Sequence, residues 1–523
     1  MMGRKDEQLG FSEIGVWMKR QQIERLEKSF YGALARFGAD LISESLFAPM
    51  YKEGVGRPSL PPVRLAKVLL LEMYEGVSDR EAEERAKFDL RWKFALDLGP
   101  EEDGFDATTL VRFRARLVAN DKERAAFEAF VQAARDARLL SRRQMLDSMA
   151  VQGAASVKDT YQLIRGAVRK LRKKARRVPG LTSQLLAVLT RDDYDEVGKA
   201  DIDWNDPAAR QALLQELVGD ARRAVGVARQ AVAEGRGDAA LVEAADLLSR
   251  VVEQDIEPAP EQEGVQIRQG VAQDRVISAT DPEMRHGRKT SSGRFDGHKA
   301  HVGMDAESEL ITDVETIPGN APDRSAVPGA LERGEQLDIP QEEITADHAY
   351  GDMGTRSLCS AHGVDLVAPL QHPSPVGGRF TKLEFQIDLE AKTCICPAGA
   401  VGQPRYRRNG ELYAFQFSRT SCGSCPLRDR CTTAAARAVD INPDEAERQH
   451  LYREQATPEF LARYRERPRI ERANAELARY GMHKARYFGR RKTTLQLAFT
   501  ALVVNILRAS RRGWLPAIAA GGA

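Results

Sequence analysis

The stretch Ile344-Thr345-Ala346-Asp347-His348-Ala349-Tyr350 decides the fold of this chain, because a short apolar run ends on a carboxylate. Such a run predicts a buried strand, and the acid then lies where the sheet meets solvent. The same pattern occurs in Met145-Leu146-Asp147-Ser148, and a third acid, Glu471, follows Arg467-Pro468-Arg469-Ile470 in a helical context. A single Asp at a strand end is more often only a turn or capping residue, so these acids need further context.

Several motifs around the three acids supply that context. They are Phe47-Ala48-Pro49, Gly56-Arg57-Pro58, Phe105-Asp106-Ala107-Thr108-Thr109-Leu110, Arg285-His286-Gly287-Arg288-Lys289, Phe295-Asp296-Gly297-His298-Lys299-Ala300-His301 and Pro318-Gly319-Asn320. With them, most of residues 40–510 resembles bacterial insertion-sequence transposases with a DDE catalytic domain. The resemblance is in particular to the insertion-sequence family numbered eleven eighty-two, which is related to the families numbered four and five.

The resemblance implies an α/β fold with a ribonuclease-H-like mixed sheet flanked by helices. It also implies that Asp147, Asp347 and Glu471 hold two Mg²⁺ or Mn²⁺ ions for DNA strand cleavage and strand transfer. Carboxylate oxygens are the ligands that Mg²⁺ prefers, and two such ions can activate an attacking oxygen and stabilise a leaving one. The implied partners are double-stranded DNA with terminal inverted repeats, target DNA and a second copy of the chain.

The segment before the third acid resembles a Tyr, Arg, Glu, Lys signature of related transposases. Tyr464 and Arg467 have the family spacing to Glu471, and the resemblance implies that they contact DNA at the transposon end. The Lys position is Ala478, so Arg479 becomes a candidate phosphate contact, as does Lys299 in the central motif. Relatives read Asp-Ser-Thr at the first acid, where this chain reads Asp147-Ser148-Met149.

Three other functions remain open from the sequence. A catalytically inactive or domesticated relative would bind DNA as a regulator and would not cut it. A nuclease or resolvase of the same fold would cut without joining, and a zinc-scaffolded interaction protein would not bind DNA.

The choice of Glu471 as third acid also has a geometric argument. Glu466, Glu471 and Glu476 are expected on one helix through Arg467. Because successive residues turn by about 100°, Glu466 and Glu476 each lie about 140° away from Glu471. Glu471 is expected to share a face with Arg467, one turn before it.

Composition is compatible with this interpretation but does not decide it. The 523 residues carry a net charge of +2, which argues neither for nor against nucleic acid, because binding depends on local patches. Met1–Gly10 has no signal pattern. The apolar stretch Leu495–Leu507 is shorter than the roughly 20 residues that span a bilayer. We therefore expect a cytoplasmic, nucleoid-associated protein without a membrane segment, and the Ala- and Arg-rich composition suggests a GC-rich bacterial genome.

Residues 1–135 are predicted to form an N-terminal helical DNA-binding domain. Ser78-Asp79-Arg80-Glu81 is a capping box directly after Gly76, which predicts a helix-turn-helix arrangement. Cations and aromatic residues alternate on its second helix, and these could contact phosphates or be ordinary solvated charges: Arg80, Arg85, Lys87, Arg91 and Lys93, with Phe88, Trp92 and Phe94.

The catalytic domain is expected over residues 140–380 and 440–510, with a helical insertion at residues 155–260. Its strands are predicted at His298–Asp305, Leu310–Ile317, Glu343–Asp347 and Val364–Pro369. The insertion is expected to hold two or three helices, broken at Pro179-Gly180 and near Trp204–Pro207.

The first helix of the insertion is strongly basic. Eight of the thirteen residues from Arg165 to Arg177 are Arg or Lys, which favours contact with DNA phosphates over a merely solvated face. The candidate contacts are Arg169, Arg172, Lys173, Lys174 and Arg176.

Five of the six cysteines fall between residues 394 and 431, which predicts a zinc-ribbon-like insertion at residues 385–435. The favoured ligands of a structural Zn²⁺ are Cys396, Cys422, Cys425 and Cys431, with Cys394 as the alternative to Cys396. Free buried thiols are the competing interpretation, and Cys359 is expected in the core.

Overall fold

The computed structural model describes residues 18–52, 59–196, 198–260, 264–289 and 293–521. Residue contacts divide the chain into two compact units. Unit 1 contains residues 1–141, 147–340 and 470–523, and unit 2 contains residues 142–146 and 341–469. The motif Gly56-Arg57-Pro58 and the segment Met1–Gly10 lie outside the described residues.

Unit 1 begins with helices that pack through apolar faces. α3 ends at Gly76 with φ of +70°, and Ser78 then caps α4, so the predicted capping box is present: Ser78 N–H donates to Glu81 Oε2 at 2.7 Å. The elements are α1 (Arg20–Glu27), α2 (Phe30–Leu41), η2 (Glu44–Leu46), η3 (Ala48–Met50), α3 (Pro62–Glu75), α4 (Asp79–Phe88), α5 (Leu90–Leu96), α6 (Ala107–Ala119) and α7 (Ala125–Asp136).

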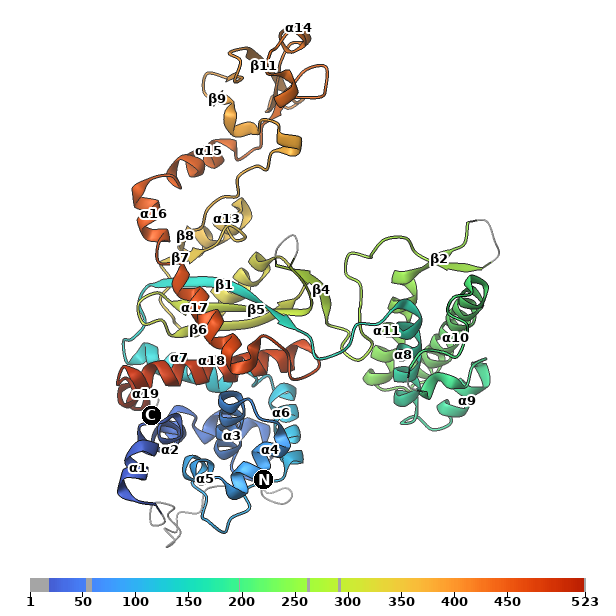
Figure 1. Ribbon diagram of the computed structural model, residues 1–523, viewed down its shortest axis with the longest axis vertical. Coiled ribbons are helices and arrows are strands. Elements are labelled where there is room, and N and C mark those ends of the chain that lie inside the picture. Colours follow the sequence, from blue (N-terminus) through green and yellow to red (C-terminus); the bar gives the residue numbers. More distant parts are fainter. Residues whose placement is uncertain (1–17, 53–58, 197, 261–263, 290–292, 522–523) are drawn as a thin grey trace. The chain divides into compact units, whose positions relative to one another are not determined.

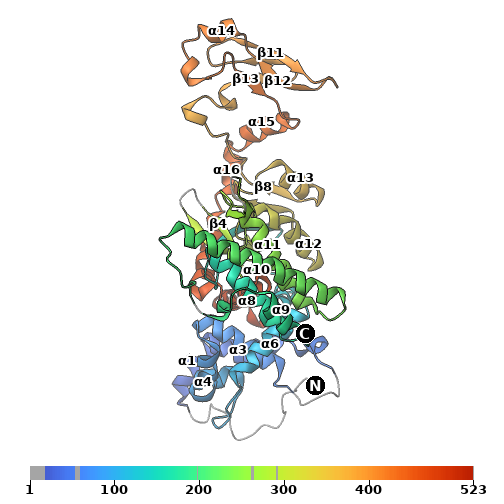
Figure 2. The same cartoon turned by 90° about the vertical axis from the view of Figure 1, so that its right-hand side faces the viewer.

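The insertion of unit 1 is helical as expected, and it contains four helices where two or three were predicted. They are α8 (Thr160–Ala175), α9 (Leu181–Val188), α10 (Pro207–Ala233) and α11 (Ala239–Asp255), with η4 (Asp193–Asp195), β2 (Ile256–Pro258) and β3 (Val265–Ile267). Figure 2 shows α8, α10 and α11 side by side, and their apolar faces form a hydrophobic core of their own. The additional helix is α9. It begins directly after Pro179-Gly180, where the sequence predicted only a break between helices.

The sheet of the protein is mixed, with strand order β4-β5-β1-β7-β8, and β6 pairs with the other edge of β5. Strand β1 (Arg143–Gln152) runs from unit 2 into unit 1. Its neighbour β5 starts so close to it that a Cβ on Gly297 would lie 2.1 Å from the Val151 carbonyl oxygen, so only glycine fits there. Unit 1 also holds β4 (Arg285–Arg288), β5 (Arg294–Asp305), β6 (Ile311–Pro318), η5 (Asp323–Ala326) and α12 (Val327–Gln336).

In unit 2 the first half of β1 pairs in parallel with β7, and β7 with β8. A separate antiparallel sheet, in the order β13-β12-β11-β10-β9, occupies the cysteine-rich segment. The elements of unit 2 are β7 (Glu343–Ala346), α13 (Met353–Ala361), β8 (Asp365–Val367), η6 (Val376–Gly378), η7 (Lys382–Glu384), β9 (Gln386–Asp388), β10 (Thr393–Ile395), β11 (Val401–Tyr406), β12 (Leu412–Gln416), α14 (Arg419–Gly423), η8 (Arg428–Arg430), β13 (Ala438–Asp440), α15 (Glu445–Glu454) and α16 (Pro458–Tyr464).

The chain returns to unit 1 through α17 (Pro468–Leu477), followed by η9 (Ala478–Met482), α18 (Arg490–Arg511) and α19 (Leu515–Gly521). α18 lies along the sheet in Figure 1, and its Asn505 bonds both backbone groups of Ile311 on β6 at 2.8 Å. By length and composition α18 could cross a membrane, but 89% of its most apolar window is buried inside the protein. The expected core helix is therefore present and is longer than the predicted Leu495–Leu507.

The expectation of a mixed α/β fold with helices around the sheet is confirmed. Each of the four strands predicted after the insertion has a counterpart, β5 to β8, with ends that differ by a few residues. The ribonuclease-H-like topology and the domain boundaries stay predictions.

Candidate functional site

Asp147 lies inside β1 and is almost fully buried, with 7% of its surface exposed. Its neighbours Leu146 and Ser148 are also buried, and the strand has another strand on each side. The Lys289 ammonium group, at the end of β4, donates to the Ser148 carbonyl oxygen at 3.3 Å. A carboxylate in such a place needs polar partners, since burying an unpaired charge is costly.

One partner of Asp147 within unit 1 is Asn474, whose Nδ2 donates to Asp147 Oδ2 at 3.0 Å. Asn474 is 8% exposed and belongs to the buried face of α17, together with Ile470, Ala473 and Leu477. This spacing of three and four residues is the buried stripe of an amphipathic helix. The contact joins residues 327 positions apart, and no pattern in the sequence indicated it.

Glu471 lies on the exposed side of the first turn of α17. It precedes Asn474 by three residues, which corresponds to about 60° of rotation and about 4.5 Å along the helix axis. The bond from Asn474 to Asp147 therefore fixes the helix turn that carries Glu471 beside the strand that carries Asp147.

The other two glutamates of this segment have different surroundings. Glu476 contacts α18, where its Oε2 accepts from Arg508 Nη2 at 2.8 Å and Nε at 3.0 Å. Glu466 lies in unit 2, where its Oε2 accepts from Arg143 at 2.6 Å.

The expectation of one continuous helix through residues 464–476 is wrong. α16 ends at Tyr464, residues 465–467 form a turn, and α17 begins at Pro468. Proline has no N–H for the carbonyl four residues earlier, and that carbonyl, of Tyr464, instead accepts from Arg467 N–H at 3.0 Å. Arg467 therefore does not share a helix face with Glu471.

Asp347 directly follows β7 in unit 2. Its Oδ1 accepts from the Ala349 N–H at 2.9 Å, and its Oδ2 lies 3.7 Å from Arg467 Nη2. Within unit 2, Leu146 and Ala346 are register partners on the parallel strands β1 and β7, and Asp347 is the next residue after Ala346.

The other residues that were predicted to contact DNA differ in their surroundings. Lys299 Nζ donates to Asp323 Oδ1 at 2.6 Å and to the Ala321 carbonyl oxygen at 2.8 Å, so this ammonium group has internal partners. Tyr464 stacks on Phe460 with ring centroids 5.8 Å apart. Arg479 lies exposed in the π-turn after α17.

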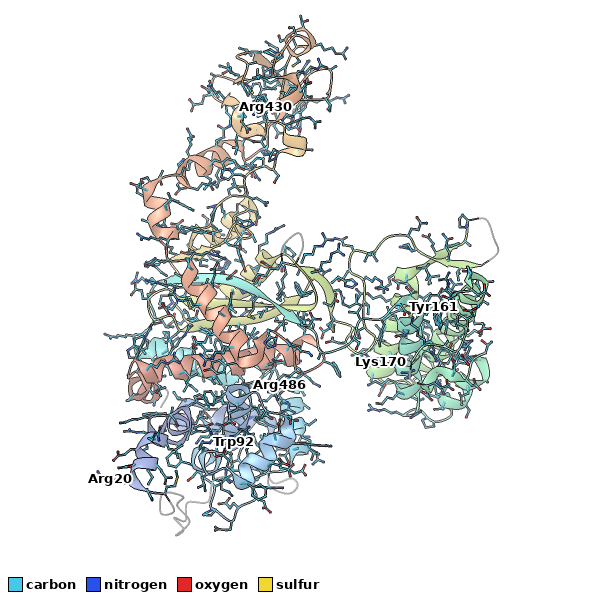
Figure 3. All side chains as sticks on the ribbon, viewed as in Figure 1. Arg20, Trp92, Tyr161, Lys170, Arg430 and Arg486 are labelled. Atoms are coloured by element: carbon cyan, nitrogen blue, oxygen red, sulfur yellow. The ribbon has the colours of Figure 1, made fainter. Side chains whose placement is uncertain are left out.

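The basic helix α8 uses part of its charge inside the insertion. Arg169 donates to the carbonyl oxygens of Tyr194 and Glu196 at 2.5 Å, and Asp195 pairs with Arg172 at 3.2 Å and with Arg176 at 3.8 Å. Lys170, labelled in Figure 3, donates to the Ala279 carbonyl oxygen at 2.9 Å, and burial lowers its pKa. Lys173 is exposed and Lys174 is half-buried.

The predicted second helix of the helix-turn-helix is broken at Asp89 into α4 and α5. Most of its cations are engaged within the domain: Arg85 with Glu75, Lys87 with Glu83 at 2.7 Å, Arg91 with Asp89 at 3.0 Å, and Lys93 with the Gly99 carbonyl oxygen at 3.0 Å. Trp92 is fully buried among these helices (Figure 3). Arg80 remains exposed on α4.

The cysteine-rich segment brings four thiols near one another. Burial raises the pKa of the Cys431 thiol, Arg437 opposes the rise, and the neighbouring thiols of Cys422, Cys396 and Cys425 add to it. None of the six cysteines forms a disulfide bond. Cys394 differs from these four thiols because it is fully buried, and burial raises its pKa to about 11. Cys359 is also fully buried, which confirms its expected position in the core.

Within the described ranges, no group of three or more His, Cys, Asp or Glu side chains is arranged to hold a metal ion. The thiols of Cys396, Cys422, Cys425 and Cys431 thus influence one another electrostatically without forming a ready tetrahedral site. For a divalent cation, the hard oxygens of Asp147, Glu471 and Asn474 have suitable chemistry, and the buried Asn474 Oδ1 has no hydrogen-bond partner in the part of the chain that is described.

Two protein families match the chain. The family described as "Transposase DDE domain" matches residues 395–509, and "Transposase domain (DUF772)" matches residues 21–116. No curated protein and no solved structure matches. The first match includes Glu471 and α18 but neither Asp147 nor Asp347. Over these two stretches the chain is thus similar to transposases of the DDE type.

Proposed function

We propose that this chain is the transposase of a bacterial insertion sequence, with Asp147, Asp347 and Glu471 as its catalytic acids. The observation that carries the proposal is the bond from Asn474 to Asp147, because it holds the helix of Glu471 at a buried acid on a central strand. The register of Leu146 with Ala346, just before the two aspartates, supports the inclusion of Asp347. Membership in the insertion-sequence family numbered eleven eighty-two rests on the sequence motifs.

The three carboxylates would hold Mg²⁺ or Mn²⁺, which when bound supplies charge stabilisation for an in-line displacement at a DNA phosphodiester. The chain's own residues then orient the substrate. Arg467 lies 3.7 Å from Asp347 and is the cation best placed to meet a phosphate at that acid. Arg479 and Lys173 are exposed cations that would bind phosphates farther away. The substrates are terminal inverted repeats and target DNA, bound by a homodimer at the nucleoid.

A cleavage assay with the full chain and a duplex carrying the element's inverted repeat tests this function. Wild type should cut and join the end only with Mg²⁺ or Mn²⁺. Asp147→Asn should bind the same duplex but cut at least a thousandfold more slowly, a loss of about 4 kcal/mol of transition-state stabilisation. Wild-type binding without cleavage would instead favour a regulator, an alternative suggested by Ala478 at the family's Lys position. Cleavage without joining would favour a nuclease.

We further propose a structural Zn²⁺ held by Cys396, Cys422, Cys425 and Cys431. The support is the electrostatic influence of the other three thiols on Cys431, together with the small core of this segment. The hydrophobic cluster of this segment has six buried members, which are Phe385, Cys394, Phe415, Phe417, Val439 and Ile441. So small a core usually needs a metal or disulfides to fold. The burial of Cys394 favours Cys396 as the ligand.

Metal analysis of the purified protein tests the zinc site. Wild type should contain about one zinc per chain, and Cys422→Ser with Cys425→Ser should contain none. Cys359→Ser is the matched control, because Cys359 is buried on α13, outside the cysteine-rich segment. An undiminished zinc content in the double variant would refute the assignment.

A further inference from the structure

The amide of Asn474 has a defined orientation in the structure. The NH₂ of the amide faces Asp147 Oδ2 at 3.0 Å and donates to it, which suits the acceptor oxygens of a carboxylate. The amide oxygen then points elsewhere. Asn474 Oδ1 is buried and has no hydrogen-bond partner among the described residues.

This arrangement is unfavourable for a residue that only fills space. A buried acceptor without a partner costs about 1–3 kcal/mol, whereas an apolar side chain of similar volume would carry no such cost. The other buried positions on this face of α17, Ile470, Ala473 and Leu477, are all apolar. The amide therefore needs a reason to be at this position, and the hydrogen bond that it makes among the described residues goes to a proposed metal ligand.

We propose that Asn474 is a positioning residue for the divalent cation. Its N–H holds Oδ2 of Asp147 and so would orient this carboxylate for a bound cation, and its buried Oδ1 would gain a partner when the site is filled. This inference rests on the proposed function, because it takes Asp147 as a metal ligand. Residues that orient ligands in this way typically change metal affinity by about 10–100-fold when they are replaced.

The full chain without DNA can be titrated with Mn²⁺, and bound metal followed by electron paramagnetic resonance. Asn474→Leu should raise the Mn²⁺ dissociation constant at least tenfold, while Tm stays within a few degrees of wild type. Asn474→Ala should raise it less, because a water can enter the vacated space and bond Asp147. Asn505→Leu is the control: it removes a buried amide that bonds only Ile311, so it should lower Tm without changing Mn²⁺ affinity.

If Asn474 only fills space, the order of the two variants should be reversed. Asn474→Ala should then raise the Mn²⁺ dissociation constant more than Asn474→Leu, since Ala leaves a cavity and Leu fills it. Wild-type Mn²⁺ affinity in both Asn474 variants would overturn the inference while the proposed function stands. Asp147→Asn tests the proposed catalytic site separately from the positioning role of Asn474. If that variant also binds Mn²⁺ like wild type, Asp147 is not a ligand, and both the proposed catalytic site and the role of Asn474 are refuted.

Discussion

The three glutamates of residues 466–476 differ in what their carboxylates contact. Glu466 accepts from Arg143 at 2.6 Å, and Glu476 accepts from Arg508 at 2.8 Å. Glu471 lies one helical turn before Asn474, whose amide bonds Asp147. The two ion pairs suit structural roles, and the place of Glu471 on the turn of α17 that Asn474 joins to Asp147 makes it the acid to test for catalysis.

Glu471→Gln should therefore abolish strand cleavage while DNA-end binding and Tm remain near wild type, because an amide is a poor ligand for Mg²⁺. Glu476→Gln should cut at a nearly normal rate but lose roughly 1–3 kcal/mol of stability, since Arg508 loses its charged partner. A cleavage assay and a thermal melt on both variants measure these effects. Wild-type cleavage by Glu471→Gln in Mg²⁺ would disprove the three-acid site.

A second residue-scale prediction concerns Glu72, which is fully buried on α3. Burial raises its pKa from 4.5 to about 8, although Arg114, 3.5 Å away, opposes the rise. The folded protein thus holds this proton more tightly than the unfolded chain does. Stability from this group is fully present below about pH 4.5 and is lost as the pH rises towards 8.

Glu72→Gln should accordingly flatten the fall of Tm between pH 5 and pH 8, since the amide stays neutral throughout. Calorimetry across this range provides the measurement, and Glu128→Gln, a half-buried partner of Arg124 on α7, is the control. Equal slopes for wild type and Glu72→Gln would contradict the prediction.

At the scale of elements, the basic helix α8 has two kinds of cation. Arg165 and Arg169 donate to groups of the insertion itself, whereas Lys173 is exposed. Replacing Lys173 and Lys174 by Gln should lower the salt dependence of DNA binding by about one unit of slope per lost phosphate contact. Arg222→Gln with Arg229→Gln on α10 removes the same charge from the same insertion and is the control. If both pairs of substitutions leave the slope unchanged, α8 does not bind DNA.

Elements with regular local patterns could be predicted from the sequence, and long-range contacts could not. The apolar run that ends at Asp347 predicted β7, and the capping box at Ser78 marked the start of α4. The run before Asp147 predicted a strand, but the expectation that this acid lies where the sheet meets solvent is wrong, because β1 continues to Gln152 and Asp147 is buried inside it. The break at Pro468 was missed, although proline at the start of a helix is a known signal. In the sequence, Asn474 looks like any polar residue on a helix. Its partner Asp147 is 327 residues away, so no local pattern indicates the bond between them.

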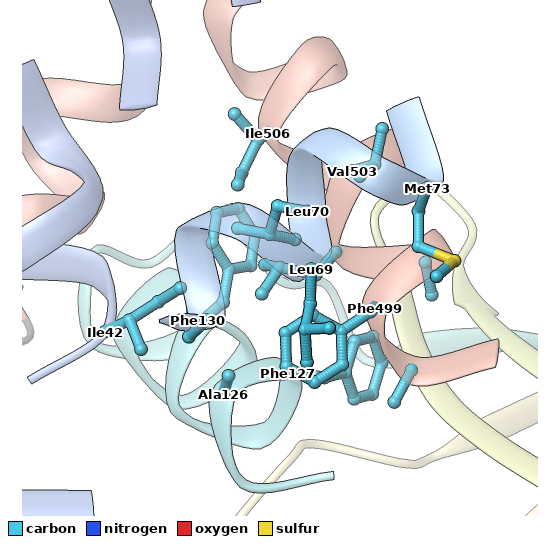
Figure 4. Close-up of a cluster of buried hydrophobic side chains, with 14 of the residues drawn as sticks. Ile42, Leu69, Leu70, Met73, Ala126, Phe127, Phe130, Phe499, Val503 and Ile506 are labelled. Atoms are coloured by element: carbon cyan, nitrogen blue, oxygen red, sulfur yellow. The ribbon is translucent and has the colours of Figure 1, made fainter. Parts of the chain in front are cut away.

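At the scale of the whole chain, the described N-terminal helices share one hydrophobic core with the C-terminal helices α18 and α19. Figure 4 shows Leu69 and Leu70 of α3 and Phe127 of α7 gathered with Phe499 and Val503 of α18. These residues belong to one hydrophobic cluster that extends within unit 1 from α1 to α19. These N-terminal helices therefore share buried apolar contacts with the C-terminal helices within unit 1, and the domain boundary predicted at residue 135 stays a prediction.

A fragment of residues 18–141 should for this reason fail to unfold cooperatively when heated. Without α18 it exposes side chains that are fully buried in the chain, such as Leu70 and Phe130, and each loses about 1.5–3 kcal/mol of burial. A few such losses equal the total stability of a typical domain, about 5–15 kcal/mol. Deleting residues 385–440 instead should leave the main transition intact, because that segment has a separate small cluster and Lys382 and Glu445 at its base are 2.7 Å apart. Circular dichroism melts of both proteins provide the test, and a sharp transition in the fragment would mean that the N-terminal helices fold alone.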